Sequence, residues 1–307
     1  MLDRDLTSIL DISPEELARV LDVSLVMKRD GVGPLLAGKT LALVFEKPSL
    51  RTRVSFEMAI RRLGGSAISL PAHEIQMGDR EPVKDVARVL STMVDGIAAR
   101  TYQHETIVEL TRYASIPIIN ALSEDEHPCQ ALADLLTLRE RFGQLRGICW
   151  TYVGEGNNIA RSLAYASVMT GMNLTVTSPP GFELPDETME RASTLAGGGS
   201  VTQMTDPHSA VKHAAAVYTD VWASMGFEHE LEERKEHFQS YQLNTELLAS
   251  APSDAFVMHD LPAHRGEEIT DEVLESENSI VFLQSENRMH AQQGLLALLL
   301  SDTPPDA

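Results

Sequence analysis

The chain has 307 residues, 45 acidic and 25 basic side chains, and a formal net charge of −20 at pH 7. This charge argues against nucleic acids and anionic membrane surfaces as partners, because both attract clustered Lys and Arg. No apolar stretch approaches the roughly 18 residues of a membrane span, and residues 1–12 are too charged for a secretory signal, so we expect a cytoplasmic protein. The two cysteines, Cys129 and Cys149, are expected as reduced thiols in buried or helical segments.

Short apolar runs alternate with helical patterns along the first half of the chain. A helix beginning at Pro14, with Ser13 as its cap, comes first. Strands are expected at 41–45, 67–70, 96–99 and 116–120, and helices after the first of these strands and at 83–94 and 105–113. This alternation predicts a parallel sheet covered by helices.

The strand at 41–45 runs into a loop that is rich in hydroxyl and guanidinium groups. The loop carries Ser49, Arg51, Thr52 and Arg53, and Ser49 is placed to cap the helix that follows. Backbone N–H groups at a helix start, two hydroxyls and two guanidinium groups suit a phosphate dianion. The alternative is a Ser-capped surface helix with solvated arginines.

The second half repeats the α/β alternation. A helix at 127–142 has Pro128 at its first position and Gly143 past its end, so a domain boundary is expected at 143–147. Beyond it, strands are expected at 148–153, 174–177, 215–219 and 256–259, and helices at 159–170 and 285–301. The sequence therefore predicts an α/β protein with two doubly wound parallel-sheet domains of similar size, 1–143 and 147–284, joined by two interdomain helices.

Polar clusters follow the expected strands at their carboxyl ends, where open α/β sheets gather ligands. They are Arg100, His127 with Gln130, Asn157 with Asn158, Asp220 with Ser224, His259 with Asp260, and, at the last helix, Arg288. Each alone has an ordinary interpretation as a cap, a turn or a core residue. The glycine turn before Asn157 does not indicate a dinucleotide site, because Ile159 stands where the third glycine is needed.

Together these segments resemble the ornithine carbamoyltransferases, within the aspartate/ornithine carbamoyltransferase superfamily. The loop at 49–53 matches the family's Ser-Thr-Arg-Thr-Arg, with Leu50 in place of a threonine, so that only its backbone N–H can contribute. The resemblance implies that 1–143 binds carbamoyl phosphate, that 147–284 binds ornithine, and that 285–307 packs back on the first domain. The residues it implies for carbamoyl phosphate are Ser49, Leu50, Arg51, Thr52, Gln76, Arg100, His127, Gln130, Asp260, Leu261 and Arg288.

An Asp-x-x-x-Ser-Met-Gly signature at 220–226 is similar to that of the ornithine branch. By resemblance, Asn158, Asp220, Ser224 and Met225 hold the amino acid end of ornithine. The family also shares its active sites within a homotrimer, where the residue matching Gln76 reaches a neighbouring subunit's carbamoyl phosphate. The implied catalytic residues are Arg100, His127, Asp260 and Arg288, and neither a metal nor an organic cofactor is expected.

Asp260 departs from the family pattern, which has His-Cys-Leu-Pro where this chain has His259-Asp260-Leu261-Pro262. An ammonium group with a pKa of about 10.4 must lose a proton before it attacks, and a carboxylate with a pKa near 3.9 holds the cation instead. Asp260 therefore predicts good amine binding and an alkaline rate optimum. Burial beside Asp220 would instead raise one carboxyl pKa and partly restore a base.

The resemblance predicts transfer of a carbamoyl group from carbamoyl phosphate to the δ-amine of L-ornithine. Asp260 leaves open a carbamoyltransferase for another amine, such as putrescine or lysine. A third possibility is a noncatalytic ligand-binding relative.

Overall fold

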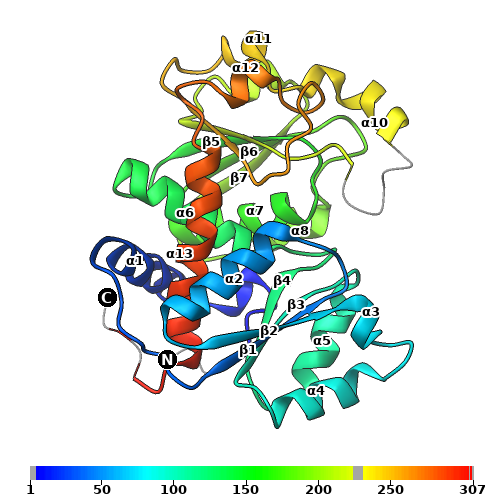
Figure 1. Ribbon diagram of the computed structural model, residues 1–307. Coiled ribbons are helices and arrows are strands. Elements are labelled where there is room, and N and C mark those ends of the chain that lie inside the picture. Colours follow the sequence, from blue (N-terminus) through cyan, green and yellow to red (C-terminus); the bar gives the residue numbers. More distant parts are fainter. Residues whose placement is uncertain (1–4, 224–230, 304, 306–307) are drawn as a thin grey trace. The chain divides into compact units, whose positions relative to one another are not determined.

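The computed structural model describes residues 5–223, 231–303 and 305, which divide into two units (Figure 1). Unit 1 comprises Met1–Gly143 and Glu286–Ala307, and unit 2 comprises Gln144–Ser285. Both units are built on parallel sheets, so the predicted α/β class with two parallel-sheet domains is confirmed. Within the described ranges, no helix is both long and apolar enough to cross a membrane.

The sheet of unit 1 has the strand order β2-β1-β3-β4, with every neighbouring pair parallel. Its strands are β1 (Thr40–Phe45), β2 (Ser66–Pro71), β3 (Gly96–Arg100) and β4 (Ile118–Leu122). The order reverses at β1, because β2 lies on one side of it and β3 on the other. The carboxyl ends of β1 and β3 therefore flank a switch point, where sheets of this kind bind ligands.

Helices cover the sheet of unit 1. They are η1 (Ile9–Asp11), α1 (Pro14–Asp30), α2 (Leu50–Arg62), α3 (Ala72–Ile75), α4 (Val83–Ser91), α5 (His104–Tyr113), α6 (Pro128–Phe142) and α13 (Val281–Leu300), which starts in unit 2. The helices α4 and α5 lie side by side against the sheet (Figure 1), where Ala87 and Leu110 pack with Ala42 and Ile97. On α13, a Cβ atom at Gly294 would meet the Ser24 hydroxyl of α1 at 2.1 Å, so glycine permits this close packing.

Local capping chemistry sets the helix starts that the sequence predicted. The Ser13 hydroxyl accepts a hydrogen bond from Glu16 N–H over 3.2 Å at the start of α1, and Ser49 caps α2 in the same way. Pro128 opens α6, and Gly143, with φ of 76°, follows its end. The last helix begins at Val281, earlier than the predicted residue 285, because Val281 packs in an apolar cluster that extends the helix.

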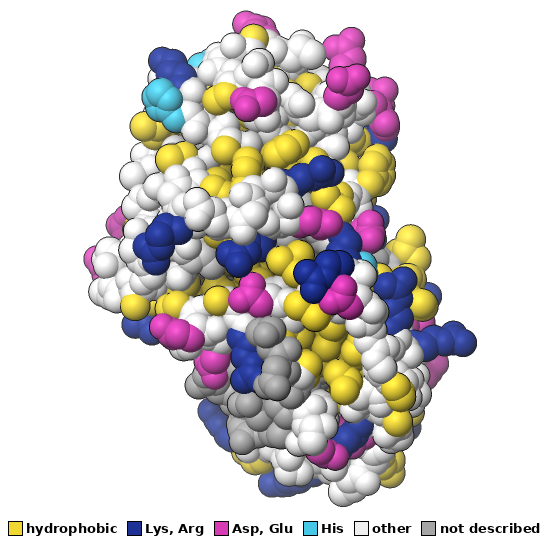
Figure 2. Space-filling model, turned by 90° about the vertical axis from the view of Figure 1, so that its left-hand side faces the viewer, with side chains coloured by type: hydrophobic (Ala, Val, Ile, Leu, Met, Phe, Trp, Pro, Cys, Tyr) yellow, Lys and Arg dark blue, Asp and Glu magenta, His cyan; other side chains and the backbone are white. Residues whose placement is uncertain are grey.

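The surface carries charges of both signs. Figure 2 shows Lys, Arg, Asp and Glu side chains interspersed on one face. On unit 1, Leu50, Val54 and Met58 form an exposed apolar stripe along α2, and Ile68 of the neighbouring β2 is exposed as well. We call these four side chains the α2 stripe.

The sheet of unit 2 has the strand order β7-β6-β5-β8-β9 and is also parallel throughout. Its strands are β5 (Cys149–Val153), β6 (Asn173–Thr177), β7 (Ser200–Met204), β8 (Ala216–Thr219) and β9 (Phe256–His259). The order reverses at β5, so the carboxyl ends of β5 and β8 flank the second switch point. Both cysteines are free, as expected: Cys129 is buried in α6, and Cys149 is the first residue of β5, where it is exposed although the other residues of the strand are buried.

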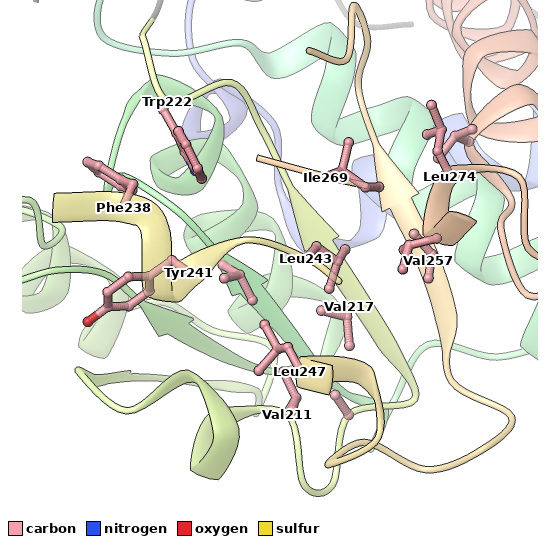
Figure 3. Close-up of a cluster of buried hydrophobic side chains, with 14 residues drawn as sticks. Val211, Val217, Trp222, Phe238, Tyr241, Leu243, Leu247, Val257, Ile269 and Leu274 are labelled. Atoms are coloured by element: carbon pink, nitrogen blue, oxygen red, sulfur yellow. The ribbon is translucent and has the colours of Figure 1, made fainter. Parts of the chain in front are cut away.

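An apolar cluster holds the chain after β8 in place. The remaining elements of unit 2 are α7 (Asn158–Thr170), α8 (Asp186–Ser193), α9 (Pro207–Ala210), α10 (Leu231–Phe238), η3 (Gln239–Tyr241), α11 (Thr245–Leu248) and α12 (Asp271–Leu274). Val217 and Val257 of the sheet pack with residues of these helices (Figure 3). Trp222 joins this cluster, with its ring 6.2 Å from that of Phe238, so the segment that follows Asp220 is anchored.

Candidate active site

The start of α2 lies at the switch point of unit 1. Ser49 Oγ accepts a hydrogen bond from Thr52 N–H over 3.3 Å, and the Ser49 hydroxyl donates to Thr52 Oγ1 over 2.8 Å. Leu50 is 68% exposed, whereas Arg51 is half-buried. The predicted convergence of both arginines is wrong for Arg53, because its exposed side chain lies 3.9 Å from Glu57 along the same helix.

Arg288 of α13 connects the starts of α2 and α6. Its Nη2 donates to Thr52 Oγ1 over 2.7 Å, and its Nη1 donates to Gln130 Oε1. Gln130 in turn donates through Nε2 to Asp134 Oδ1 over 2.8 Å. Because Arg288 is only 3% exposed, its guanidinium group is fixed in a largely dry environment, where it interacts strongly with an anion.

Two further predicted residues, Arg100 and His127, are buried in the same unit. Arg100 ends β3, and its carbonyl accepts a hydrogen bond from Glu46 N–H, just past β1, over 2.8 Å. His127 is the N-cap of α6. Burial holds the pKa of His127 well below its usual range, and the charges of Arg288 and Arg100 lower it further. The imidazole is therefore neutral at physiological pH and can donate one N–H to a carbonyl oxygen.

Gln76 lies apart in the chain, after the short helix α3. Its side chain is exposed and its backbone is left-handed, with φ of 49°. Arg80 N–H donates to the Gln76 carbonyl over 2.9 Å, which closes the turn. The turn presents the Gln76 side chain to the surface of unit 1.

In unit 2, Asn157 and Asp220 meet at the switch point. Asn157 follows β5 and caps α7, with its Oδ1 accepting hydrogen bonds from Ile159 N–H and Ala160 N–H. Its Nδ2 donates to Asp220 Oδ2 over 2.9 Å, which joins the ends of β5 and β8. Asn158, the amide chosen from the sequence, is half-buried at the first position of α7. The Asn157 contact with Asp220 was not foreseen.

Asp220, His259 and Asp260 form a polar cluster. Oxygen and nitrogen atoms of the three side chains all lie within 4.8 Å of one another. Burial raises the pKa of Asp220 well above its usual range, and the negative charge of Asp260 raises it further. Two carboxyl groups this close resist joint ionisation, so the charge of one holds the pKa of the other above its ordinary value.

Glu268 was not among the residues singled out from the sequence. It is fully buried, and its Oε1 lies 3.0 Å from His259 Nε2 and accepts a hydrogen bond from His264 N–H over 2.6 Å. Burial alone would lower the pKa of His259, but hydrogen bonds to Asp260 and Glu268 outweigh it and raise the pKa to about 9. A glutamate nine residues after a histidine carries no local signal, so only the fold reveals this partner.

The loop after β9 completes this cluster. Leu261 N–H donates to His259 Nδ1 over 2.9 Å, and Asp260 Oδ1 lies 3.3 Å from the same nitrogen. These two groups compete for Nδ1, because the N–H needs a neutral ring and the carboxylate favours a protonated one. The Leu261–Pro262 peptide bond is cis. The predicted residues Ser224 and Met225 lie outside the described residues.

Within the described residues of unit 2, two groups of side chains bring three potential cation ligands within 4.8 Å: Asp220, His259 and Asp260, and His264, Glu267 and Glu268. Oxygen ligands suit a hard metal ion, and they equally suit an ammonium group. Glu268 is already engaged by His259 and His264 N–H. His259 is likewise engaged by Glu268 and by Leu261 N–H, so the carboxyl oxygens of Asp220 and Asp260 are the groups of the first cluster that suit a cation.

Comparison with known proteins finds a family match for each unit. A family model described as the aspartate/ornithine carbamoyltransferase carbamoyl-P binding domain matches residues 4–140, and one described as the Asp/Orn binding domain of the same proteins matches residues 146–299. The chain belongs to the aspartate/ornithine carbamoyltransferase family. The family's carbamoyl-P binding domain thus spans β1 to β4, and its Asp/Orn binding domain spans β5 to β9.

Relatives within the family match nearly end to end. An ornithine carbamoyltransferase from Methanocorpusculum labreanum is 51% identical over 304 residues, covering 98% of this chain and 99% of the relative. An anabolic ornithine carbamoyltransferase from Pyrococcus furiosus is 47% identical over 303 residues, covering 97% and 96%. A solved structure of ornithine carbamoyltransferase from Pyrococcus furiosus superposes with a TM-score of 0.93 at 46% identity, covering 97% of each chain.

Proposed function

We propose that this protein transfers the carbamoyl group of carbamoyl phosphate to the δ-amine of L-ornithine, giving L-citrulline and phosphate. The observation that carries the proposal is the convergence of Thr52, Gln130 and Arg288 at the ligand-binding edge of unit 1. Near-full-length similarity to ornithine carbamoyltransferases supports the choice of substrates.

In the carbamoyl phosphate half, the start of α2 binds the phosphate. Ser49, Arg51 and Thr52 contribute their side chains, and Leu50 contributes its backbone N–H. Arg100 and Arg288 hold the anion and stabilise phosphate as it leaves. Neutral His127 donates a hydrogen bond to the carbamoyl oxygen, and the Gln130 amide and the Leu261 carbonyl orient the carbamoyl group.

In the ornithine half, Asn158, Asp220, Ser224 and Met225 bind the amino acid, and the carboxyl groups of Asp220 and Asp260 attract its δ-ammonium. The ammonium loses a proton to the ionised carboxylate of this pair. The nitrogen lone pair then attacks the carbamoyl carbon, and the bond from that carbon to the phosphate oxygen breaks. The second proton of the attacking nitrogen passes to the departing phosphate, which leaves a neutral citrulline δ-nitrogen. Preorganised charge supplies the stabilisation, so the proposed reaction uses no metal or organic cofactor.

The assembly we propose is a cytoplasmic homotrimer with shared active sites. The α2 stripe places exposed apolar side chains beside the phosphate-binding helix start, and a second copy of the chain would cover them. Gln76, exposed in its turn, would reach the carbamoyl phosphate of the neighbour. Val54→Glu should yield monomers in analytical ultracentrifugation. A Val54→Glu protein that sediments like the wild type would contradict this interface.

We further propose that the protein works in arginine biosynthesis, since its relative from Pyrococcus furiosus is named an anabolic enzyme. Another acceptor amine is the second candidate, because Asp260 replaces the cysteine expected from family resemblance and adds a carboxylate beside Asp220. The relatives described above carry ornithine in their names, which favours ornithine.

An amine panel tests the proposal. Purified protein is given carbamoyl phosphate with ornithine, putrescine or lysine, and phosphate release is followed for each amine. We expect ornithine to give the highest kcat/KM, with citrulline formed in equal amount to phosphate. A preference for putrescine or lysine would support the second candidate. Tight binding of a bisubstrate phosphonate without phosphate release would indicate a noncatalytic relative.

A further inference from the structure

The N-terminal segment Asp5–Asp11 is hydrogen-bonded along β4. Leu6 N–H donates to the Ile118 carbonyl over 2.8 Å, and Asn120 N–H donates to the Leu6 carbonyl over 2.7 Å. The side chain of Asp5 accepts a hydrogen bond from Ile118 N–H over 2.7 Å. The segment therefore pairs with β4, the strand that precedes the loop to His127, in addition to connecting to α1.

A buried carboxylate joins this segment to the loop that carries His127. Glu126 directly precedes His127 and is only 5% exposed. Its Oε2 accepts a hydrogen bond from Ile9 N–H over 3.1 Å, and its Oε1 accepts one from the Ser8 hydroxyl. A carboxylate buried this far is costly unless donors satisfy it, so loss of either donor favours movement of the side chain towards water.

Asn120 of β4 also holds the same loop, and its Nδ2 lies 3.5 Å from the Glu126 carbonyl oxygen, to which it donates. The fully buried Asn120 donates through Nδ2 to the Thr7 carbonyl over 2.8 Å and to Ser123 Oγ over 3.1 Å. Ser123 N–H donates to the Glu126 carbonyl over 3.0 Å. The loop between β4 and α6 therefore has its main chain tied to β4 and its Glu126 side chain tied to the N-terminal segment.

We propose that Glu126 is a positioning residue for carbamoyl phosphate, which makes the N-terminal segment part of this half of the active site. This inference rests on the proposed function. Glu126 contacts Ser8 and Ile9 instead of the substrate, and it acts by fixing the backbone at His127, the N-cap of α6. The N–H groups of the first turn of α6 and the Gln130 side chain come directly after His127, so their positions depend on where this backbone lies. A displacement of about 1 Å in a positioning contact is enough to cost on the order of 100-fold in rate.

Three variants test the proposal at increasing severity. Ser8→Ala removes one donor, Glu126→Gln keeps one carbonyl acceptor, and Glu126→Ala removes both contacts. We expect the KM for carbamoyl phosphate to rise in this order, from about threefold to more than about tenfold, because charged hydrogen bonds are strong. The KM for ornithine should stay within about twofold, since the unit that positions Asp220 is unchanged.

Ser13→Ala is the matched control. Like Ser8, Ser13 caps a helix start near the N-terminus, but it contacts Glu16 and not Glu126. It should lower the melting temperature and leave the KM for carbamoyl phosphate unchanged. If Ser8→Ala and Glu126→Gln behave like Ser13→Ala, the role of Glu126 is structural only and the proposal is overturned. These two milder variants decide the question even if Glu126→Ala does not fold.

A binding measurement separates this inference from the proposed function. If the wild type forms no citrulline, the proposed function fails, and the same variants are then titrated with inorganic phosphate by calorimetry. Weaker phosphate binding in Ser8→Ala and Glu126→Gln than in Ser13→Ala would still support positioning by Glu126. Equal dissociation constants in all of these proteins would overturn it.

Discussion

Arg288 Nη2 donates a hydrogen bond to Thr52 Oγ1 over 2.7 Å, although the two residues are 236 positions apart in the chain. The same guanidinium group reaches Gln130 at the start of α6. Two helix starts that offer N–H groups to an anion are therefore held by one cation from α13. We expect this contact to be the chief positioning interaction of the carbamoyl phosphate half.

Thr52→Val tests that contact with little change in volume. The variant should lower kcat/KM for carbamoyl phosphate by about tenfold, because a hydrogen bond to a charged group is lost inside the protein. Thr52→Ser keeps the hydroxyl and should stay within about threefold of the wild type. A double-mutant cycle of Thr52→Val with Arg288→Gln should be strongly non-additive. Additive losses would mean that the two side chains do not act together.

Asn157→Ala tests the hydrogen bond from Asn157 to Asp220, which connects the ends of β5 and β8. The variant should lose about 1 to 2 kcal/mol of unfolding free energy, because the cap of α7 disappears. It should also raise the KM for ornithine about tenfold, because Asp220 loses the donor that orients it. The KM for carbamoyl phosphate should not change.

Asn244→Ala is the control for Asn157→Ala. Asn244 caps α11 through Leu247 N–H over 2.9 Å and makes no described contact with Asp220. Denaturant unfolding and steady-state kinetics are measured on both variants. If Asn244→Ala raises the KM for ornithine as much as Asn157→Ala does, the rise reflects a general loss of stability in unit 2. It would then not be due to the lost hydrogen bond to Asp220.

The pH dependence of the Asp260→Asn variant tests the interaction between the carboxyl groups of Asp220 and Asp260. Asp260 helps to raise the pKa of Asp220, so removing its charge lets Asp220 ionise at a lower pH. The acidic limb of the kcat/KM profile for ornithine should therefore move to lower pH. The plateau should fall about tenfold, because Asp220 alone remains to hold the ammonium and accept its proton.

Asp260→Cys restores the residue that family resemblance leads us to expect. We expect it to raise the KM for ornithine, because one negative charge beside the ammonium is removed, and to move the rate optimum to lower pH. If both the pH profile and the KM remain those of the wild type, our account of Asp260 is wrong.

The net charge of −20 predicts a response to salt. Acidic side chains outnumber basic ones, and both kinds are interspersed on the face shown in Figure 2, so screening should relieve net repulsion in the folded protein. The melting temperature should rise by several degrees between 0.1 M and 2 M KCl. The KM for carbamoyl phosphate should rise over the same range, because salt weakens anion binding. A melting temperature that falls with salt would contradict this account.

Local chemistry made much of the fold predictable. Ser13, Ser49 and Pro128 mark helix starts through interactions with their own neighbours, and the structure has helices beginning at those points. The strands at the centres of both sheets are short apolar runs, which the sequence displays directly. The edge strand β7 was missed, because its sequence, Ser-Val-Thr-Gln-Met, is largely polar and contains no apolar run.

Contacts between distant residues were beyond reach of the sequence. Asn157 and Asp220 are 63 positions apart, and only the parallel pairing of β5 with β8 brings them together. In the sequence, Glu268 is one of several acidic residues in a charged segment. Only the fold shows that it is buried against His259. Such partners are fixed by tertiary packing, which leaves no periodic or capping signal to find.

Isotope transfer follows the carbamoyl group itself from carbamoyl phosphate to ornithine. Carbamoyl phosphate labelled with ¹³C at the carbonyl is incubated with the protein and ornithine, and the products are followed by NMR together with phosphate release. We expect the label to appear in citrulline, on the carbon bonded to the δ-nitrogen, in equal amount to phosphate, and Arg288→Gln to slow both together. Label that remains in carbamoyl phosphate, or phosphate released without labelled citrulline, would contradict this expectation.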